Sequence, residues 1–494
     1  MKKTPYQIHQ EIEAERAAEE LKSIIDKPIL EPHEIWEITP ETFYQWRVKH
    51  DYPRILSFFS QNLKGFEDWK KETNFTDDLL ISFGLSNCIN PNPSKDKRKF
   101  IVERTWENEK TKFISYQNID NKYYNLGPNP VNHKVVSSFI GYIDWCNSKG
   151  IRIMEDWRDN GIISRPSKSN PVGFPQAIEV TILNGLKLLK VGGIEVEPDA
   201  FNLIKPKYFE FVNAEYLKLS GRMATQGHQL IFENSFLDHL ECENLDLALV
   251  VLNNCSISNL HIANSSLQQW QFNFCGVNGK AYDTDFRMVS IYGGYFNLDF
   301  NACTFYNVDA RQSSKNDLSF ENTYRTFKKV YAEHGDDKKA IEYFLLEKSM
   351  ERQRIRKEIF LYPQASLFKQ TKKEKLITQA KHSLLFTIKY FFLWLNDFYW
   401  GYGRKPFRVV RNSIGLIFLF ALIYLMGHSN INMPPKETSF SFLDSIYYST
   451  VTFTTLGYGD FTPSGFLRIV SAIEACLGGL SLGFLVAAFS NFKY

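Results

Sequence analysis

The sequence is poor in the residues from which enzymes and metal centres are built. Its 494 residues include only seven cysteines, and none of them forms a Cys-x-x-Cys pair, which suits a reducing compartment. Residues 28–200 contain no phosphate-binding loop, no cluster of metal ligands and no nucleophile paired with a base. A secretory signal is not expected either, because Met1–Asp26 is polar and rich in glutamate. We therefore expect a protein that is not an enzyme and that needs no organic cofactor.

Long hydrophobic runs are confined to the last hundred or so residues. Val409–Met426 is almost wholly apolar, and at 1.5 Å per residue it would span about 27 Å, close to the ~30 Å core of a bilayer. Phe466–Phe489 is a second run of this kind. The first run has no polar face, which disfavours a buried helix of a soluble protein. We expect two membrane-spanning helices, an outer helix at 409–427 and an inner helix at 465–492.

Between the two runs, Ser441–Phe453 is rich in Ser, Thr and Tyr and is too short to cross a bilayer. It leads directly into the heptad Thr454-Thr455-Leu456-Gly457-Tyr458-Gly459-Asp460. A re-entrant helix at 441–453, surrounded by protein and aimed into a cavity, fits this pattern.

The heptad at 454–460 resembles the selectivity filter of potassium channels, in which four copies of the segment line a pore and backbone carbonyls replace the water around K⁺. The resemblance implies a homotetramer, with K⁺ as the transported ion. Gly457 and Gly459 can take positive φ, which would let successive carbonyls point at one axis. The side chains of Leu456 and Tyr458 would point away from the axis and wedge the filter against its surroundings. Leu456 stands where valine is commoner but keeps this apolar wedge, so K⁺ selectivity is expected to survive. The implied ion-binding residues are Thr455, Leu456, Gly457, Tyr458 and Gly459, with K⁺ at the first four.

The same resemblance assigns supporting roles around the filter. Thr454 would anchor the filter to the pore helix, and Asp460 would form a hydrogen bond behind it. Some members of the family pair this aspartate with a carboxylate on the pore helix, but that position is Val451 here. Tyr447 or Tyr448 is therefore the expected partner of Asp460.

The second apolar run carries an ionisable residue, Glu474, about a third of the way along. Charge at that depth is expensive, and such residues are usually paired or functional. We expect Glu474, in its protonated form, to form a hydrogen bond with the pore helix near Ser449 or Thr450. The alternative is a carboxylate that reaches toward the membrane surface without a special role.

Further along the same run, three glycines lie where the inner helix of the family bends, and glycine makes such a bend easy. They are expected to form a gating hinge: Gly478, Gly479 and Gly483. Three apolar residues at i, i+4 and i+7 follow, and they would form a constriction at the cytoplasmic end, although ordinary helix packing explains the spacing nearly as well. These are Leu482, Val486 and Phe489.

Charge sets the expected orientation. Four basic residues crowd the start of the first run, whereas the loop at 428–441 holds a single lysine beside a glutamate. The positive-inside rule then places both termini in the cytoplasm of a multi-pass protein of the cell (inner) membrane. A basic stretch, Lys348–Lys381, has ten Lys or Arg against three Glu. It would face the anionic headgroups of the lipid bilayer, with a solvated helical face as an equal alternative.

Ser383–Trp400 is apolar and aromatic but is interrupted by Lys389, Asn396 and Asp397. We interpret residues 383–407 as an interfacial amphipathic helix on the inner leaflet. A third full span is the competing interpretation, and it would conflict with the charge rule.

A second pattern is an apolar residue at every fifth position, from Leu247 to Val277. Neither a helical nor a strand period explains five. The pattern resembles the pentapeptide-repeat family, which implies a right-handed quadrilateral β-helix with the central residues stacked inside. Trp270 is large for its corner, and the phase slips near Ala281. Weaker traces run back to Phe236 and Ile231.

Other segments complete the expected organisation. Leu318–Glu358 has helical spacing broken at His334-Gly335-Asp336, and it predicts a helical hairpin that caps the solenoid and connects it to the membrane part. The expected domains are an N-terminal helix (1–27), a cytoplasmic α+β domain (28–220), the pentapeptide β-helix (221–312), hairpin and basic linker (313–382), interfacial helix (383–407) and pore (408–494).

The sequence therefore predicts a multidomain membrane protein: a K⁺ channel that conducts passively and is gated through its cytoplasmic part, which would sense an unidentified cytoplasmic ligand. Two alternatives stay open. One is a membrane-tethered scaffold or DNA mimic with a vestigial pore, since 228–310 is acidic, although no nucleic-acid partner is expected. The other is a non-selective cation channel, in which Tyr458 would typically be replaced.

Overall fold

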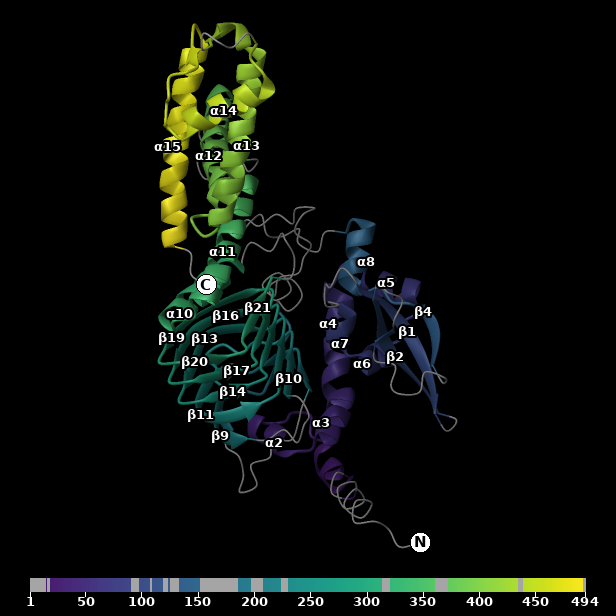
Figure 1. Cartoon of the computed structure of the whole chain (residues 1–494). Helices are drawn as coiled ribbons and strands as arrows, with labels where there is room; N and C mark the ends of the chain where they lie inside the picture. Colours follow the sequence, from purple (N-terminus) through teal and green to yellow (C-terminus); the bar gives the residue numbers. More distant parts are fainter. Residues whose placement is uncertain are drawn as a thin grey trace. The chain divides into compact units, whose positions relative to one another are not determined.

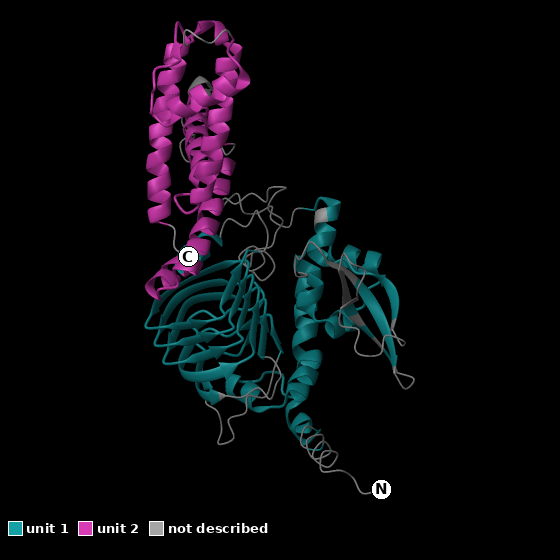
Figure 2. Cartoon of the chain, in the orientation of Figure 1, with its two compact units in different colours: residues 1–326 teal, residues 327–494 magenta. Residues whose placement is uncertain are grey.

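The computed structural model describes residues 15, 18–89, 97–106, 109–118, 123–124, 133–151, 185–196, 208–223, 230–312, 320–359, 372–433 and 439–491. The chain forms two compact units, Met1–Thr326 and Phe327–Tyr494 (Figure 2). The first unit contains an α+β region and a β-solenoid, and the second contains long helices (Figure 1). The expected N-terminal helix is described only in part: residues 18–24 are helical, and residues 1–14 lie outside the described residues.

The α+β region of the first unit combines short helices with an antiparallel sheet in the order β3-β2-β1-β4. Proline at the first or second position starts α2, α3 and α4, where the missing N–H is tolerated. The bounds are α2 Pro32–Glu37, α3 Pro40–Trp46, α4 Tyr52–Asn62, α5 Phe66–Thr73, α6 Asp77–Phe83, α7 Leu85–Ile89, α8 Tyr142–Lys149, β1 Lys97–Trp106, β2 Glu109–Asn118, β3 Tyr123–Tyr124 and β4 His133–Ser138.

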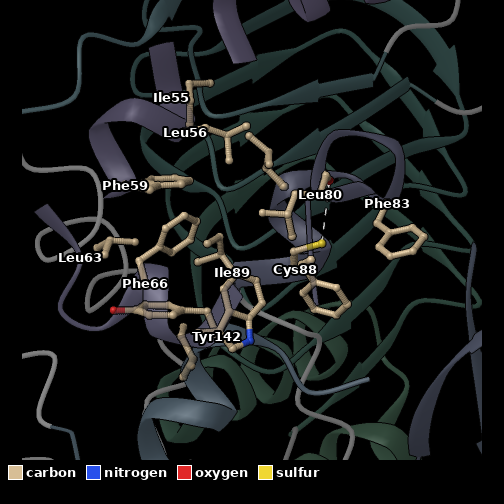
Figure 3. Packing of buried hydrophobic residues seen from close by; sticks show 14 of the residues in the cluster. Ile55, Leu56, Phe59, Leu63, Phe66, Leu80, Phe83, Cys88, Ile89 and Tyr142 are labelled. Carbon is tan, nitrogen blue, oxygen red and sulfur yellow. Dashed lines mark hydrogen bonds between the residues drawn. The ribbon is translucent and has the colours of Figure 1, made fainter. Parts of the chain in front are cut away.

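The core of this region is built from large apolar side chains on the faces of α4 to α8 that turn toward one another (Figure 3). Phe59, Phe66 and Tyr142 form a chain of edge-on or tilted ring contacts with centroids 5.6 to 5.8 Å apart. Trp69 joins the same cluster and donates its indole N–H to the Ile140 carbonyl at 3.0 Å. Such burial is the main source of stability for a domain of this kind.

The solenoid consists of short parallel strands stacked into sheets, one of which has the order β21-β18-β15-β12-β10-β7. Its strands begin well before residue 221, so the expected boundary is too late. The strands are β5 Leu189–Lys190, β6 Glu195–Val196, β7 Tyr208–Glu210, β8 Val212–Asn213, β9 Lys218–Met223, β10 Leu230–Glu233, β11 Glu241–Ala248, β12 Val250–Asn253, β13 Ser256–Ala263, β14 Ser266–Gln268, β15 Gln271–Asn273, β16 Gly276–Tyr282, β17 Asp285–Arg287, β18 Ser290–Tyr292, β19 Tyr295–Asn301, β20 Thr304–Tyr306 and β21 Asp309–Arg311.

The five-residue period is confirmed as an inward stack. Leu247 pairs with Leu267 and Leu252 with Phe272, twenty positions later in each case, as four five-residue sides require. The predicted central residues are all buried: Leu247, Leu252, Ile257, Ile262, Leu267, Phe272 and Val277. Trp270 is accommodated as well, because it is buried and its indole N–H donates to the Leu247 carbonyl at 2.8 Å.

Two details of the repeat differ from the sequence interpretation. The traces assigned to Ile231 and Phe236 are wrong by one residue, since Phe232 is the residue that pairs with Leu252 and is buried. The corners are marked by left-handed backbone every five residues, often at asparagine, which tolerates that conformation. From residue 244 to 269 these are Asn244, Leu249, Asn254, Asn259, Asn264 and Gln269.

The expected phase slip near Ala281 is present. Ile262 pairs with Ala281, only nineteen positions later, so one side of the coil is a residue shorter. Gly279 makes this side fit, because its φ is 153° and a Cβ there would lie 2.0 Å from the Leu260 carbonyl oxygen. Only glycine allows so close an approach of two backbones.

Helices cover both ends of the solenoid. At the start, Trp36 of α2 and Phe43 of α3 lie against Phe209 of the first coils, with ring centroids 5.1 and 5.4 Å apart. At the other end, α10 (Phe320–Glu333) lies on the last coils: Thr323 Oγ1 accepts from the Phe296 N–H at 3.1 Å. The predicted cap is therefore confirmed. Open solenoid ends need such cover.

The second unit continues the hairpin and contains the membrane helices (Figure 1). Its elements after α10 are α11 Asp337–Glu358, α12 Lys372–Trp400, α13 Pro406–Met426, β22 Ile431–Asn432, α14 Phe442–Phe453, β23 Thr462–Pro463 and α15 Leu467–Ser490. The helices α13 and α15 are long and apolar enough to cross a membrane, and only 22% of each apolar window is buried. Core helices of a soluble protein would be mostly buried, so this supports the two predicted spans.

The segment expected to form an interfacial helix from residue 383 is part of a longer element. The helix α12 has 29 residues and begins at Lys372, within the stretch expected to be a linker. Its outward residues are largely apolar and exposed, including Leu384, Phe391 and Leu395. Residues 360–371 of the expected basic linker lie outside the described residues.

Candidate ion-conduction site

The short helix α14 holds the heptad at 454–460. Its start is fixed by a capping box, in which Ser441 Oγ accepts from the Asp444 N–H at 3.2 Å and Asp444 Oδ2 accepts from the Ser441 N–H at 2.7 Å. The helix ends at Phe453, where the heptad begins. The C-terminal end of a helix carries a partial negative charge, which favours a cation just beyond it.

The backbone of the heptad alternates in the way the glycines predict. Gly457 has φ 58° and Gly459 has φ 78°. Thr455 also has positive φ, 60°, which the sequence does not signal because a β-branched residue rarely adopts it. Thr455 Oγ1 donates to the Thr454 carbonyl at 2.7 Å, and the Leu456 N–H donates to the Val451 carbonyl at 3.0 Å. These contacts hold the strained residue on the end of α14.

All seven heptad residues are exposed in the single chain. The two large side chains, Leu456 and Tyr458, are 60% and 67% exposed. The sequence interpretation places both as wedges against protein surroundings. A burial of that kind needs surfaces that one copy of the chain does not supply.

Tyr447 and Tyr448 have different partners. The Tyr447 hydroxyl donates to Asp460 Oδ2 at 2.8 Å, so the expected bond behind the heptad is present. Tyr448 does not share this role; its hydroxyl lies 2.9 Å from Ser471 Oγ on α15. Thr454 Oγ1 donates to the Thr450 carbonyl at 2.7 Å, which ties the heptad to α14.

Glu474 connects three helices behind the heptad. It is fully buried, and its Oε1 forms a hydrogen bond with Ser449 Oγ on α14. Its Oε2 accepts from the Tyr424 hydroxyl on α13 at 2.6 Å. Of the two partners considered from the sequence, Ser449 is the one found. Thr450 instead donates to the Ile446 carbonyl at 2.7 Å.

A count of protons shows which form of Glu474 fits this network. Ser449 has one hydroxyl proton but two acceptor neighbours, Glu474 Oε1 and the Ile417 carbonyl at 2.8 Å. Both contacts are hydrogen bonds only if Glu474 carries a proton and donates it to Ser449. A neutral acid also avoids burying a charge at this depth. The network therefore fits the protonated form.

The three predicted hinge glycines are not equivalent. A Cβ on Gly478 would lie 1.7 Å from the Phe453 carbonyl oxygen, whereas nothing lies within 4 Å of one on Gly479 or Gly483. Gly478 is thus the point of closest approach between α15 and the end of α14. The helix α15 is continuous from Leu467 to Ser490. The structure gives Gly478 a packing role that the hinge interpretation does not include.

The predicted constriction residues share an exposed face of α15: Leu482, Val486 and Phe489 are each about half or more exposed. Other outward apolar residues of this helix, such as Leu480, are exposed to a similar extent. Phe489 contacts Phe407 of α13, with ring centroids 6.2 Å apart, whereas Leu482 and Val486 stay mostly exposed within the described part of a single chain.

The end of α12 forms contacts with both long helices that the sequence did not predict. The Tyr399 hydroxyl forms a hydrogen bond with Ser481 Oγ, and the rings of Trp400 and Phe484 lie 4.7 Å apart. Asn412 of α13 donates to the Phe398 carbonyl at 2.9 Å. These residues look unremarkable in sequence, because nothing in their spacing shows which helix they face.

Asp397 joins α11, α12 and α13. It accepts hydrogen bonds from Arg352 of α11 and from Arg408 of α13, the latter at 3.0 Å. Burial alone would raise the pKa of the Asp397 carboxyl, but the hydrogen bonds and charges of the two arginines hold it below its ordinary value. Asp397 is therefore an ionised link between the hairpin and the start of α13.

Residues 413–493 match a family model described as an ion channel. The match covers most of α13 and all of α14, the heptad and α15. No curated protein matches the chain. The C-terminal part is thus an ion-channel segment joined to an N-terminal β-solenoid of about five turns. Such a segment points to transport rather than catalysis and, with the two apolar helices, to a membrane protein that assembles from several copies.

Proposed function

We propose that this ion channel is a potassium-selective homotetramer that conducts K⁺ passively through the heptad at 454–460. The observation that carries the proposal is the heptad itself, held at the C-terminal end of α14 with positive φ at Gly457 and Gly459. Carbonyls aligned by such a backbone can replace the hydration shell of K⁺. Thr455 to Tyr458 would supply the ion sites.

The exposed surfaces of the single chain support assembly around an axis. One heptad cannot enclose an ion, and the exposed Leu456 and Tyr458 need neighbours. On α15, Leu482 and Val486 are exposed as well. Four copies would bury the wedges and bring four heptads to one axis.

Charge supports the proposed orientation. Basic residues gather at the start of α13, including Arg408 and Arg411, and the loop after α13 holds a single lysine. The positive-inside rule then places both termini in the cytoplasm and the heptad toward the outside. The cell (inner) membrane is the proposed location, with the basic stretch at 348–381 near anionic headgroups.

Reversal potentials test the selectivity. Purified protein in planar bilayers, with different K⁺ concentrations on the two sides and Na⁺ added to equalise the total cation concentration, is expected to give a reversal near the K⁺ equilibrium potential, because a filter of this kind conducts K⁺ in preference to Na⁺. A reversal near zero would indicate a non-selective cation channel. The absence of any current would favour a scaffold with a vestigial pore.

A pair of glycine variants links this selectivity to the heptad. Gly457→Ala and Gly465→Ala both place a Cβ at positive φ, 58° and 55°, with nothing within 4 Å of it. Each costs about 1–2 kcal/mol of backbone strain. Only Gly457 lies in the heptad, so only Gly457→Ala is expected to abolish K⁺ selectivity or current. Equal effects would place the ion sites elsewhere.

Gating through the N-terminal part has a physical route in the second unit. The helix α11 of the hairpin is joined to α13 through Asp397, and the end of α12 holds α15 through Tyr399 and Trp400. A displacement of α11 would therefore be transmitted to α13 and α15, near one end of each helix. The proposed stimulus is a ligand of the N-terminal region that changes the position of α11.

A matched pair of carboxylate variants tests this route. Asp397→Asn removes the charge that joins α11 to α13, and we expect about a fivefold change in the open-to-closed ratio, corresponding to ~1 kcal/mol for a half-buried ion pair. Glu351→Gln is the control, because its ion pair with Lys348, at 2.7 Å, has similar exposure but lies within α11 alone. Single-channel recording measures both. Equal open probabilities for Asp397→Asn and wild type would eliminate this route.

A further inference from the structure

A basic pocket of about 420 Å³ lies between α11, α12 and α13 in the second unit. Four arginines line it, Arg352 and Arg356 from α11 and Arg408 and Arg411 from α13. Among the described residues that line it, Asp397 is the one acidic residue. Four positive charges against one negative charge leave the pocket three positive, so it is suited to an anion.

The arginines divide into two pairs. Arg352 and Arg408 hold Asp397, so their positions are fixed by the protein itself. Among the side chains that the structure describes, no carboxylate pairs with Arg356 or Arg411; Arg411 contacts the neutral amide oxygen of Asn412 at 3.3 Å. Both are exposed. Their guanidinium groups are therefore available to an oxyanion, to which arginine forms short, strong hydrogen bonds.

Apart from Asp397, the α12 side of the pocket is lined by aromatic residues. The rings of Trp394 and Phe398 are stacked, with centroids 5.1 Å apart and planes 9° apart, and both are exposed. On α13 the exposed Ile414 and Phe418 follow Arg411 at i+3 and i+7, on the same helix face. A basic mouth thus continues into an exposed apolar strip along a membrane helix.

We propose that this pocket binds the headgroup of an anionic phospholipid. Arg356 and Arg411 hold the phosphate oxygens, and an acyl chain lies along Trp394, Phe398 and the strip on α13. Basic pockets between helices on the cytoplasmic side suit lipid phosphates. The assignment rests on the proposed function in one respect, that α13 spans the membrane with Arg411 at the cytoplasmic edge.

The apolar strip is what favours a lipid over a soluble phosphate compound. A free phosphate or nucleotide would use the arginines but would leave Ile414 and Phe418 without contact. A lipid uses both surfaces at once. The bound lipid would also join α11 to α13 beside the Asp397 link, so it would stabilise the contact through which the hairpin reaches the pore.

Native mass spectrometry of the purified full chain, in micelles that contain phosphatidylcholine and phosphatidylglycerol, tests the site without any ion current. We compare Arg356→Gln/Arg411→Gln with Lys381→Gln/Lys405→Gln, a control pair that removes the same charge from exposed positions outside the pocket. The arginine pair is expected to lose about tenfold or more in affinity for phosphatidylglycerol, because direct charge-assisted hydrogen bonds are lost. The lysine pair is expected to lose less than about threefold.

Three outcomes would overturn the proposal. Equal losses in the two pairs would mean a general attraction of the basic surface for the bilayer. Equal retention of the two lipids by wild type would mean that the pocket does not select the charged headgroup. Binding of soluble glycerol phosphate as tight as that of phosphatidylglycerol would assign the pocket to a free phosphate ligand. A channel that proves non-selective for K⁺ leaves the result of this experiment unaffected.

Discussion

Gly478→Ala is expected to abolish ion flux and to prevent stable assembly, whereas Gly479→Ala leaves both close to wild type. The Cβ of an alanine at 478 would lie 1.7 Å from the Phe453 carbonyl oxygen, and at 479 it would meet nothing within 4 Å. The clash at 478 is with backbone, so no side-chain rotation can relieve it. The helix α15 would have to move away from the end of α14.

The size of the effect follows from what this contact supports. Overpacking in a well-packed core costs about 1–3 kcal/mol and more where backbone must move. Phe453 is the last residue of α14 before the heptad, so a shift there displaces the proposed ion sites directly. The replacement at 479 adds a better helix former, worth about 1 kcal/mol in a helix interior.

Size-exclusion chromatography of the purified assembly and K⁺ flux from vesicles measure the two variants. The glycine pattern alone suggests a hinge at 478–479. In that case both alanines would stiffen α15 equally, and both variants would assemble normally but open less often. An intact, conducting Gly478→Ala assembly would contradict the packing role. Reduced opening of Gly479→Ala alone would support the hinge interpretation instead.

The contrast between the two glycines shows where sequence reasoning stops. Length and apolarity fix α13 and α15, and the heptad fixes the end of α14, because these signals are local. The close approach of Gly478 to Phe453 joins residues 25 positions apart, and no local pattern records it. The same holds for Asp397, whose two arginine partners lie 45 and 11 positions away.

The solenoid shows both sides of this limit. Its inward stack is predictable because the period of five repeats seven times, and the structure confirms every central residue from Leu247 to Val277. The earlier coils are misassigned by one residue, since Ile231 and Phe232 are both apolar and hydrophobicity alone does not choose between them. The left-handed corners at Asn234 and Asn244 carry the missing phase information.

The positive φ of Thr455 is a third feature that the sequence does not predict. Glycine signals such a conformation at 457 and 459, but threonine argues against it. The bonds from Leu456 and Thr455 to α14 and Thr454 hold it in place. The sequence identifies the candidate site through its glycines, whereas the backbone strain at Thr455 is visible only in the folded structure.

Glu474→Gln and Glu474→Ala are expected to differ strongly in stability and in current. If Glu474 carries a proton, glutamine can replace it: the amide N–H₂ donates to Ser449 Oγ, and the amide oxygen accepts from the Tyr424 hydroxyl. Alanine removes the group that joins the two hydroxyls and leaves a cavity, while Ser449 keeps the Ile417 carbonyl and Tyr424 keeps Ser471 Oγ at 3.1 Å. Truncating a large buried side chain to alanine costs about 2–5 kcal/mol, so Glu474→Ala is expected to lose about that much stability and most of its current.

The same network predicts a dependence on pH that glutamine should remove. As pH rises, Glu474 of the wild type loses its proton, and Ser449 can then donate to Glu474 or to the Ile417 carbonyl but not to both. The contact between α14 and its neighbours then weakens, so the open probability of the wild type should change with pH. Glutamine cannot titrate, so Glu474→Gln is expected to give a flat profile.

Single-channel recording across pH, with thermal unfolding of the same three proteins, decides between the two forms of Glu474. Tyr448→Phe serves as a control, because it removes a hydroxyl that reaches Glu474 only through Ser471 and Tyr424 and it keeps the titrating carboxyl, so its open probability should still depend on pH. A glutamine variant as unstable as the alanine variant would show that Glu474 is ionised, since only a carboxylate would then satisfy its partners. A glutamine variant with the wild-type pH profile would show that the open probability does not depend on this proton, because the only group that distinguishes the two proteins is the one that titrates.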